Sequence, residues 1–293
     1  MNVWEQYYQL LIQGDTKALA RIISLVENEV KGFEAFMESL PEKSSSTIIG
    51  ITGPPGAGKS TLTDALIEIL INENKKIGVL CIDPSSPFNF GSLLGDRIRM
   101  STWFNHPNVF IRSLATRGSL GGLHPKIIEI TDVMKAADYD YIIIETVGVG
   151  QSEVEIAGLA DVTIVVLVPE GGDVIQTMKA GLMEIADIFV VNKSDRPDAE
   201  TYINNLKMML APAFNNKETV PIVKTVASEK KGIEELKEKI LFKSNFDPER
   251  KMRLLADKAY QLIQNKKMKK ISKEELYQQL KTEKNIYRLI QKY

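Results

Sequence analysis

The sequence predicts an α/β fold in which a mainly parallel sheet is covered by helices on both faces. Short apolar runs alternate along the chain with segments of helical periodicity. The runs are apolar throughout, which suits strands that are buried on both faces, as parallel strands are. One run also leads directly into a glycine-rich loop followed by a helical segment, a strand-loop-helix unit.

Residues 1–44 are expected to form an N-terminal helical arm. Leu19, Ile22, Ile23 and Val26 fall on one stripe of a helix, and Asp15 is well placed to cap its start. The segment "PEKSSS" then breaks the pattern.

The sheet itself is expected within residues 45–242. Its strands are predicted at the apolar runs "TIIGIT", "KIGVLCID", "NVFIRSL", "YDYIIIE", "DVTIVVLV", "DIFVVN" and "VPIVKTVA".

Residues 243–293 are expected to form a C-terminal helical arm that could serve dimerisation. Asp247 with Pro248 is typical of a helix start, and Ser272 with Glu275 resembles a capping box. This arm carries fourteen Lys or Arg against six Asp or Glu, a net charge of +8 in a chain of net charge −1. It could dock on an acidic surface, or it could be an ordinary solvated helical face.

The composition excludes several classes of protein. With 44% hydrophobic and 26% charged residues, the chain is ordinary for a globular protein of 293 residues. Cys81, the single cysteine, lies in an apolar run, so we expect a buried core residue and neither a disulfide nor a cysteine metal site. No apolar stretch approaches bilayer length, the N-terminus lacks a signal-peptide pattern, and aromatic residues are sparse among the basic ones. We therefore expect a cytoplasmic protein that binds neither membrane nor nucleic acid.

A phosphate-binding loop is predicted at "GPPGAGKST", between the first strand and the next helix. Its glycines let backbone N–H groups turn toward phosphate oxygens, and the helix N-terminus adds partial positive charge. Lys59 is expected to reach the β- and γ-phosphates, and the Ser60 hydroxyl to ligate magnesium. The fold is therefore predicted to be a P-loop NTPase, with nucleotide bound by Gly53, Pro55, Gly56, Ala57, Gly58, Lys59, Ser60 and Thr61.

A guanine-binding motif is predicted at "VVNKSD", where Asn192, Lys193 and Asp195 follow a strand. A carboxylate can accept both N1–H and the exocyclic amino group of guanine, whereas adenine lacks that donor pair. The later segment "TVAS" stands where a second guanine-contacting loop belongs. GTP is therefore favoured over ATP, with the second loop contributing Val226, Ala227 and Ser228.

Four acidic or amide side chains are candidates for the metal and for catalysis. Glu145, at the end of its strand, is expected to bind magnesium directly or through water, with Gly148 near the γ-phosphate. Asp83 could orient the attacking or metal-bound water, or simply cap a loop; Asp96 could bind the metal, or cap a helix. Gln151 could position the attacking water, or belong to a turn.

Taken together and in order, these motifs resemble the MeaB/ArgK family, the chaperone GTPases of cobalamin-dependent acyl-CoA mutases. The resemblance rests on the P-loop, "DPSSPF", "GSLLGDRIRM", "RGSLGGL", "ETVGVGQSEVEIAGLAD", "EGGDVIQTMKAGLMEIADI" and "NKSD", and extends from about Tyr8 to Leu241. It implies a GTPase of the signal-recognition/MinD-like class that hydrolyses GTP to GDP and phosphate with magnesium, slowly without its partner.

The resemblance also implies a homodimer that binds methylmalonyl-CoA mutase or a relative, gates adenosylcobalamin loading, and protects or reactivates that enzyme. It implies switch segments at about 84–100, 145–155 and 169–181. In the third, Asp173 and Lys179 match positions that relay the nucleotide state to the partner. The family usually has aspartate-glutamate-leucine-glutamine there, whereas this chain has "DVIQ" and lacks the glutamate.

Two other functions stay open from the sequence alone. One is a P-loop small-molecule kinase or transport-associated ATPase, which would prefer ATP. The other is a nucleotide-dependent scaffold with negligible turnover. A metal-storage role is disfavoured because the chain has only two histidines, His106 and His124, which we expect to be loop or surface residues.

Overall fold

The computed structural model describes residues 3–41, 45–83, 100–116, 123–146, 155–169, 181–210, 220–244 and 248–293. The chain divides into two compact units, Met1–Asp247 and Pro248–Tyr293. The first unit holds both the N-terminal helices and the sheet. The division into a separate N-terminal arm, a nucleotide domain and a C-terminal arm stays a prediction.

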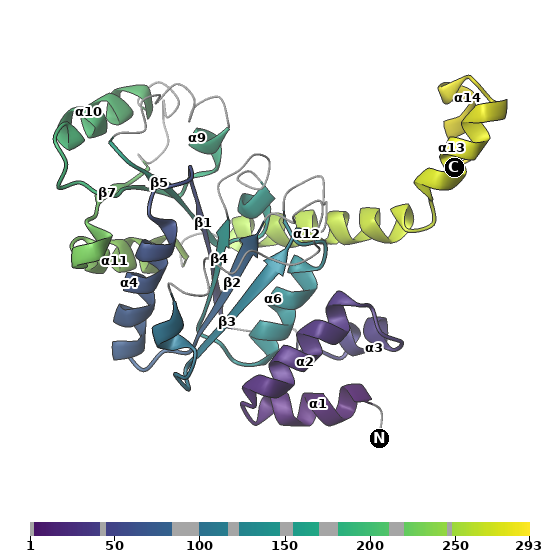
Figure 1. The fold of residues 1–293 in the computed structure, drawn as a ribbon, viewed down its shortest axis with the longest axis horizontal. Helices are drawn as coiled ribbons and strands as arrows, with labels where there is room; N and C mark the ends of the chain where they lie inside the picture. The colour runs from purple at the N-terminus through teal and green to yellow at the C-terminus, as the bar shows by residue number, and fades with distance from the viewer. Residues whose placement is uncertain are drawn as a thin grey trace. The chain divides into compact units, whose positions relative to one another are not determined.

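The first unit is built on a parallel sheet of seven strands in the order β3-β2-β4-β1-β5-β6-β7 (Figure 1). Each strand forms at one of the predicted apolar runs, and β4 and β5 are buried along their whole length. The predicted α/β fold with a parallel sheet is therefore confirmed. The strands are β1 (Thr47–Thr52), β2 (Ile77–Asp83), β3 (Val109–Ala115), β4 (Tyr141–Thr146), β5 (Val162–Leu167), β6 (Ile188–Val191) and β7 (Ile222–Lys224).

Helices cover both faces of this sheet, because alternate strand residues point to opposite sides. On one face, α4 (Lys59–Asn72) and α11 (Ile233–Ser244) pack against one large apolar cluster that includes Cys81. On the other face, α9 (Leu182–Ile185) and α10 (Ala199–Leu210) pack against β5 and β6, and α6 (Ile127–Ala136) contacts β4 (Figure 1). The helix that begins at the P-loop is therefore fixed directly against the central strands.

Three helices precede the sheet: α1 (Val3–Ile12), α2 (Thr16–Glu27) and α3 (Phe33–Glu38). Asp15 caps α2, as predicted, by accepting hydrogen bonds from the backbone N–H groups of Lys17 and Ala18 at 2.7 and 3.1 Å. The predicted apolar stripe of α2 is buried. The Trp4 ring stacks on the Phe36 ring at 4.6 Å between centroids, so α1 and α3 are held together by aromatic packing.

Charged side chains join these helices to the sheet. The Arg112 guanidinium on β3 donates to Glu27, and to the Ser24 hydroxyl at 3.1 Å, both on α2. His124 is 1% exposed, and its Nε2 lies 3.6 Å from the Glu27 carboxylate. His124 therefore lies in a loop, one of the two predicted settings, but it is not at the surface, because the N-terminal helices cover it.

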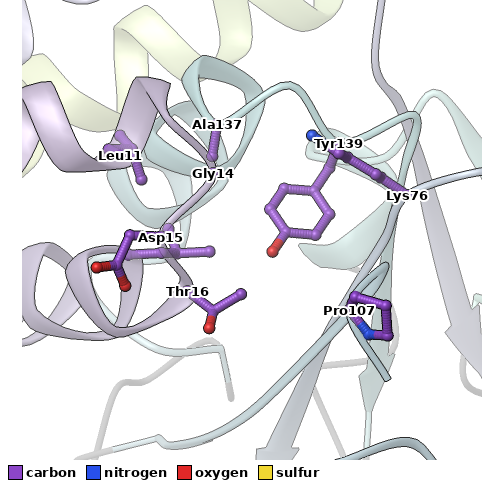
Figure 2. A pocket seen from close by; sticks show the side chains of 9 residues that line it. Leu11, Gly14, Asp15, Thr16, Lys76, Pro107, Ala137 and Tyr139 are labelled. Atoms are coloured by element: carbon purple, nitrogen blue, oxygen red, sulfur yellow. The ribbon is translucent and has the colours of Figure 1, made fainter. Parts of the chain in front are cut away.

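A small cavity lies where the α1–α2 turn meets the segments that precede β2, β3 and β4. It has a volume of about 20 Å³, room for about one water molecule. Figure 2 shows the Tyr139 hydroxyl pointing into the space between Thr16 and Pro107. Burial raises the pKa of that hydroxyl, so it stays neutral. The cavity is too small for a substrate and is best explained as a packing gap.

The second unit is helical: α12 (Pro248–Met268), α13 (Lys273–Thr282) and α14 (Ile286–Ile290). The predicted cap is present, since the Ser272 hydroxyl accepts hydrogen bonds from the backbone N–H groups of Glu274 and Glu275 at 3.2 and 3.4 Å. Within the described ranges of both units, none of the helices combines the length and the apolar character needed to cross a membrane.

Lys126 gives a test of the junction between the N-terminal helices and the sheet. Its ammonium lies 2.5 Å from Glu29 and 2.7 Å from Glu129, and 4.6 Å from the Phe33 ring centroid. Burial alone would lower the pKa of Lys126, but the bonds to Glu129 and Glu29 outweigh burial and raise it. Lys126→Met should lower the free energy of unfolding by about 1–3 kcal/mol at pH 7–9, measured in denaturant.

The pH dependence of that loss follows from the raised pKa. The ion pairs contribute fully below the ordinary lysine value of 10.5, and the contribution is lost as the pH rises through the higher folded-state pKa. The difference between Lys126→Met and wild type should therefore shrink only above that ordinary value. Lys135→Met is the matched control. Its pair with Asp132 lies on α6, which begins directly after Lys126, and is more exposed than the Lys126 pairs, so its loss should cost less than about 0.5 kcal/mol. Equal losses in the two variants would contradict the assigned role.

Candidate functional site: a nucleotide pocket at the strand ends

The predicted site residues gather at one edge of the sheet. Because the strands are parallel, their carboxyl ends meet there, which is where open α/β sheets bind ligands. The P-loop follows β1, Glu145 is the next-to-last residue of β4, and Asn192 follows β6. Glu145 stands in register with Ile51 of β1 and Cys81 of β2, so the acid lies between the P-loop strand and the strand that ends at Asp83.

Two glycines of the P-loop occupy positions that exclude any side chain. Gly53 and Gly58 have φ values of 138° and 86°. A Cβ on Gly53 would lie 2.1 Å from the Val166 carbonyl oxygen, and one on Gly58 would lie 2.4 Å from Asn192 Nδ2. The loop therefore packs tightly against β5 and against the predicted guanine motif.

Two lysine ammonium groups lie on the P-loop. Lys59 is 7% exposed and its Nζ donates to the carbonyls of Gly53 at 2.8 Å and Pro54 at 3.1 Å. Lys193 Nζ donates to the Gly56 carbonyl at 2.9 Å. Two positive charges thus lie on the loop, which suits a bound polyphosphate.

Glu145 is tied to the P-loop helix by two hydroxyl groups. Ser60 Oγ donates to Glu145 Oε1 at 2.6 Å, and Thr63 Oγ1 donates to Glu145 Oε2 at 2.9 Å. All three side chains are buried, with 8%, 0% and 5% exposure for Ser60, Thr63 and Glu145. Both carboxylate oxygens therefore face α4, and the acid lies against the serine predicted to ligate the metal.

These oxygen atoms fit a magnesium ion. Mg²⁺ prefers oxygen ligands and is usually held by one or two carboxylates together with water and substrate phosphates. Ser60 and Glu145 supply a hydroxyl and a carboxylate at the end of the P-loop, as that chemistry requires. Among the residues that the structure describes, no cluster of three or more His, Cys, Asp or Glu side chains could hold a metal without such outside ligands.

Asn192 connects three parts of the predicted guanine pocket. Its amide Nδ2 donates to the Ala57 carbonyl at 2.9 Å, which joins β6 to the P-loop. Its Oδ1 accepts from the Thr225 hydroxyl and from the backbone N–H of Ala227, both at 3.1 Å. The predicted second loop therefore lies beside the first guanine motif.

The remaining residues of the two guanine-binding segments differ in their exposure to solvent. Asp195 is exposed, as is Ser228, whereas Val226 and Ala227 are buried. The pKa of Lys231 is raised by its hydrogen bond to Glu229 and, to a smaller degree, by the negative charge of Asp195. Asp195 is therefore close to the turn at 226–231 and leaves its carboxylate toward solvent, available to a base.

The other predicted residues are placed as follows. Pro55, Gly56 and Thr61 are exposed at the mouth of the P-loop. Asp83 is the last residue of β2 and stands in register with Ala115; the structure describes its backbone but not its side chain. Five further predictions lie outside the described residues: Asp96, Gly148, Gln151, Asp173 and Lys179.

Thr63 is a site residue that the sequence analysis missed, and Thr225 belongs to the predicted "TVAS" loop but was given no contact of its own. Thr63 comes three residues after Ser60, so helical spacing places both on one face of α4, and this signal could have found it. Thr225 directly follows β7 and contacts Asn192 across 33 positions of the chain, a pairing that only the strand order brings about.

Comparisons with known proteins agree with this geometry. Residues 19–285 match the family model described as methylmalonyl Co-A mutase-associated GTPase MeaB. A Pyrococcus abyssi protein named as a GTPase is 48% identical over 241 residues, which cover 80% of this chain and 74% of that protein. GTPase ArgK of Escherichia coli is 39% identical over 237 residues, 77% of this chain and 71% of that protein.

Two further similarities bear on function. A fused isobutyryl-CoA mutase of Geobacillus kaustophilus is 41% identical over 201 residues, 65% of this chain and 18% of that protein. A crystal structure described as LAO/AO transport system kinase superposes with a TM-score of 0.67 at 28% identity, covering 96% of this chain and 87% of that one. The predicted P-loop fold is thereby confirmed.

Asn192 gives a test of how the pocket is held together. Asn192→Ala removes all three of its hydrogen bonds and leaves buried groups unpaired, so it should lower the free energy of unfolding by about 2–4 kcal/mol. It should also weaken GDP binding, because the P-loop loses its support from β6. Ser194→Ala is the control: its hydroxyl makes one partly exposed bond to the Thr225 carbonyl at 3.0 Å, and its loss should cost less than about 1 kcal/mol. Denaturant unfolding with and without GDP measures both effects, and full GDP affinity in Asn192→Ala would argue against the link.

Proposed function

The chain belongs to the MeaB family of methylmalonyl-CoA mutase-associated GTPases, and we propose that it is the switch that gates adenosylcobalamin loading of a cobalamin-dependent acyl-CoA mutase. It is a GTPase: it binds guanine nucleotide and converts GTP to GDP and phosphate. The proposed role includes protecting or reactivating the mutase. The fused isobutyryl-CoA mutase supports a link to mutases, since a GTPase-like segment there shares one chain with the enzyme.

The observation that carries the proposal is the buried contact between Ser60 and Glu145. It joins the phosphate-binding helix to the end of β4, directly before residues 147–154. A change at the terminal phosphate acts on Ser60 and is therefore felt at Glu145, the start of the proposed second switch segment. Loops that are ordered by a γ-phosphate and released on hydrolysis are a common way to signal nucleotide state.

Each residue has a distinct part in this mechanism. Lys59 and the P-loop N–H groups bind and orient the β- and γ-phosphates, and the low exposure of Lys59 keeps its charge effective. Ser60 and Glu145, with Asp83 and Asp96, would hold Mg²⁺. That ion, when bound, neutralises charge that develops on the phosphate oxygens during transfer. Asp195 accepts the guanine N–H donors, supported by Asn192, Lys193 and the loop at 226–228.

The parts that face the partner are proposed from the resemblance. Gly148 contacts the γ-phosphate and Gln151 positions the attacking water in the second switch. Asp173 and Lys179 relay the nucleotide state to the mutase in the third. Hydrolysis is slow until the mutase completes the site, as in other GTPases whose catalytic groups arrive from a partner.

We also expect a homodimer and a cytosolic location. The C-terminal unit supports the dimer, because large apolar side chains remain exposed on one side of α12. They are Met252, Leu255, Tyr260 and Ile263, with exposures of 67%, 56%, 70% and 55%.

A second candidate function is a P-loop kinase or transport-associated ATPase, because the similar crystal structure is described as a transport system kinase. Competition binding separates the two. Because Asp195 is exposed and a carboxylate can accept both guanine donors, GDP should displace a fluorescent guanine nucleotide at least about 100-fold better than ADP. Asp195→Ala should remove most of that difference. ADP binding better than GDP, or transfer of phosphate from ATP to a small acceptor, would favour the kinase.

The mutase link is tested with purified components. The client is first identified by pull-down from native cytosol with a nonhydrolysable GTP analogue, and complex formation and adenosylcobalamin transfer are then measured with that mutase. GTP-bound and GDP-bound protein should differ in transfer rate by tenfold or more, the effect of a coupling of about 1.4 kcal/mol. Lys179→Ala should reduce the difference, and Lys207→Ala, an exposed lysine on α10, should not.

Two results would contradict this function. Transfer that proceeds equally with GTP, GDP and no nucleotide would exclude a gate. A hydrolysis rate that stays negligible with the mutase present would favour a nucleotide-dependent scaffold over a switch.

A further inference from the structure

Thr63 is a buried hydroxyl that the phosphate-binding motif does not account for. It lies on α4, one turn beyond Ser60, and is 0% exposed. Its Oγ1 lies 2.9 Å from Glu145 Oε2 and 3.0 Å from the Lys59 carbonyl oxygen. A hydroxyl has one proton to donate, and a carboxylate is a stronger acceptor than a helix carbonyl that already accepts a backbone N–H. The proton is therefore directed at Glu145.

The length of Glu145 makes such a contact necessary. A glutamate has one more rotatable bond than an aspartate, so its carboxylate can take more positions and costs more entropy to fix. The bond from Ser60 restrains only one carboxylate oxygen, because Ser60 Oγ contacts Oε1 alone. A second donor on the other oxygen fixes the plane of the group as well as its distance from α4.

We infer that Thr63 is a positioning residue: it holds the Glu145 carboxylate so that Ser60 and Glu145 present their oxygens to one metal ion. The inference rests on the magnesium site proposed above. In this arrangement the Ser60 proton stays directed at Glu145 while a lone pair of Ser60 Oγ remains available to a cation. Thr63 itself does not touch nucleotide or metal. It acts through Glu145, as outer hydrogen-bond partners of metal ligands do.

Thr63 also explains how a glutamate, which is longer than an aspartate, can be used at the end of β4. Glu145 lies at the edge of the apolar cluster between α4 and the sheet, beside Ile51 and Cys81 in register. A carboxylate that turned into this cluster without donors would be costly to bury. Two hydroxyls from one helix face supply the donors, so the acid is paired before any ligand binds.

The test compares Thr63→Val, which keeps the shape and removes the hydroxyl, with Thr63→Ser, which keeps the hydroxyl. Two Mg²⁺ concentrations are measured: the one that half-saturates binding of a fluorescent GDP and the one that half-saturates GTP hydrolysis. Both should rise about tenfold or more in Thr63→Val. The KM for GTP at saturating Mg²⁺ should change much less. Thr63→Ser should restore wild-type behaviour.

A second readout needs neither metal nor nucleotide. In the nucleotide-free protein, Thr63→Val should lower the melting temperature by about 2–4 °C, because it leaves Glu145 Oε2 without this donor. In the Glu145→Ala background the same change should cost less, since no buried carboxylate remains to be paired. Thr163→Val is the matched control: Thr163 is 0% exposed and, among the described residues, its hydroxyl has no hydrogen-bond partner. It should leave the Mg²⁺ dependence unchanged.

The outcomes separate this inference from the proposed metal site. If Glu145→Ala leaves the Mg²⁺ half-saturation unchanged, the metal site itself is wrong. If Glu145→Ala raises the Mg²⁺ half-saturation but Thr63→Val does not, the role of Thr63 is overturned while the metal site stands. The same holds if Thr63→Val and Thr163→Val behave alike. A rise in Thr63→Val with rescue in Thr63→Ser supports the inference.

Discussion

The nucleotide site depends on one buried hydrogen bond, between the Ser60 hydroxyl and the Glu145 carboxylate at 2.6 Å. It joins the first turn of α4, the helix after the P-loop, to the end of β4, directly before residues 147–154. Because both groups are buried, a movement of either one breaks this bond, which costs free energy. The phosphate-binding part and the proposed signalling part of the molecule are therefore mechanically connected even before nucleotide is considered.

A second connection lies on the other side of the P-loop, where Asn192 bonds to Ala57 and to the loop at 225–227. The P-loop is thus held between two buried polar contacts, one toward β4 and one toward β6. Glycines at positions 53 and 58 let the backbone come this close. A GTPase needs this rigidity at the phosphates, because positioning and electrostatic stabilisation supply most of the catalysis of phosphoryl transfer.

Much of this fold could be predicted from the sequence, because parallel strands buried on both faces leave a strong apolar signal. The strand order could not, since the insertion of β4 between β2 and β1 depends on crossovers that leave no local pattern. Glu145 was recognised by its position at the end of a strand. Its partner Thr63 was missed, although its spacing from Ser60 places both on one face of α4. The burial of His124 in its loop was not foreseen, because it is decided by α2, which packs from nearly 100 residues away. The switch residues Asp96, Gly148, Gln151, Asp173 and Lys179 stay predictions.

The account is tested most directly by a crystal structure with Mg²⁺ and a nonhydrolysable GTP analogue. It predicts that Ser60 Oγ binds the metal, that Glu145 stays hydrogen-bonded to Thr63 with its other oxygen on the metal side, and that Asp195 accepts hydrogen bonds from guanine. A metal bound away from Glu145, or a purine that leaves Asp195 uncontacted, would contradict it.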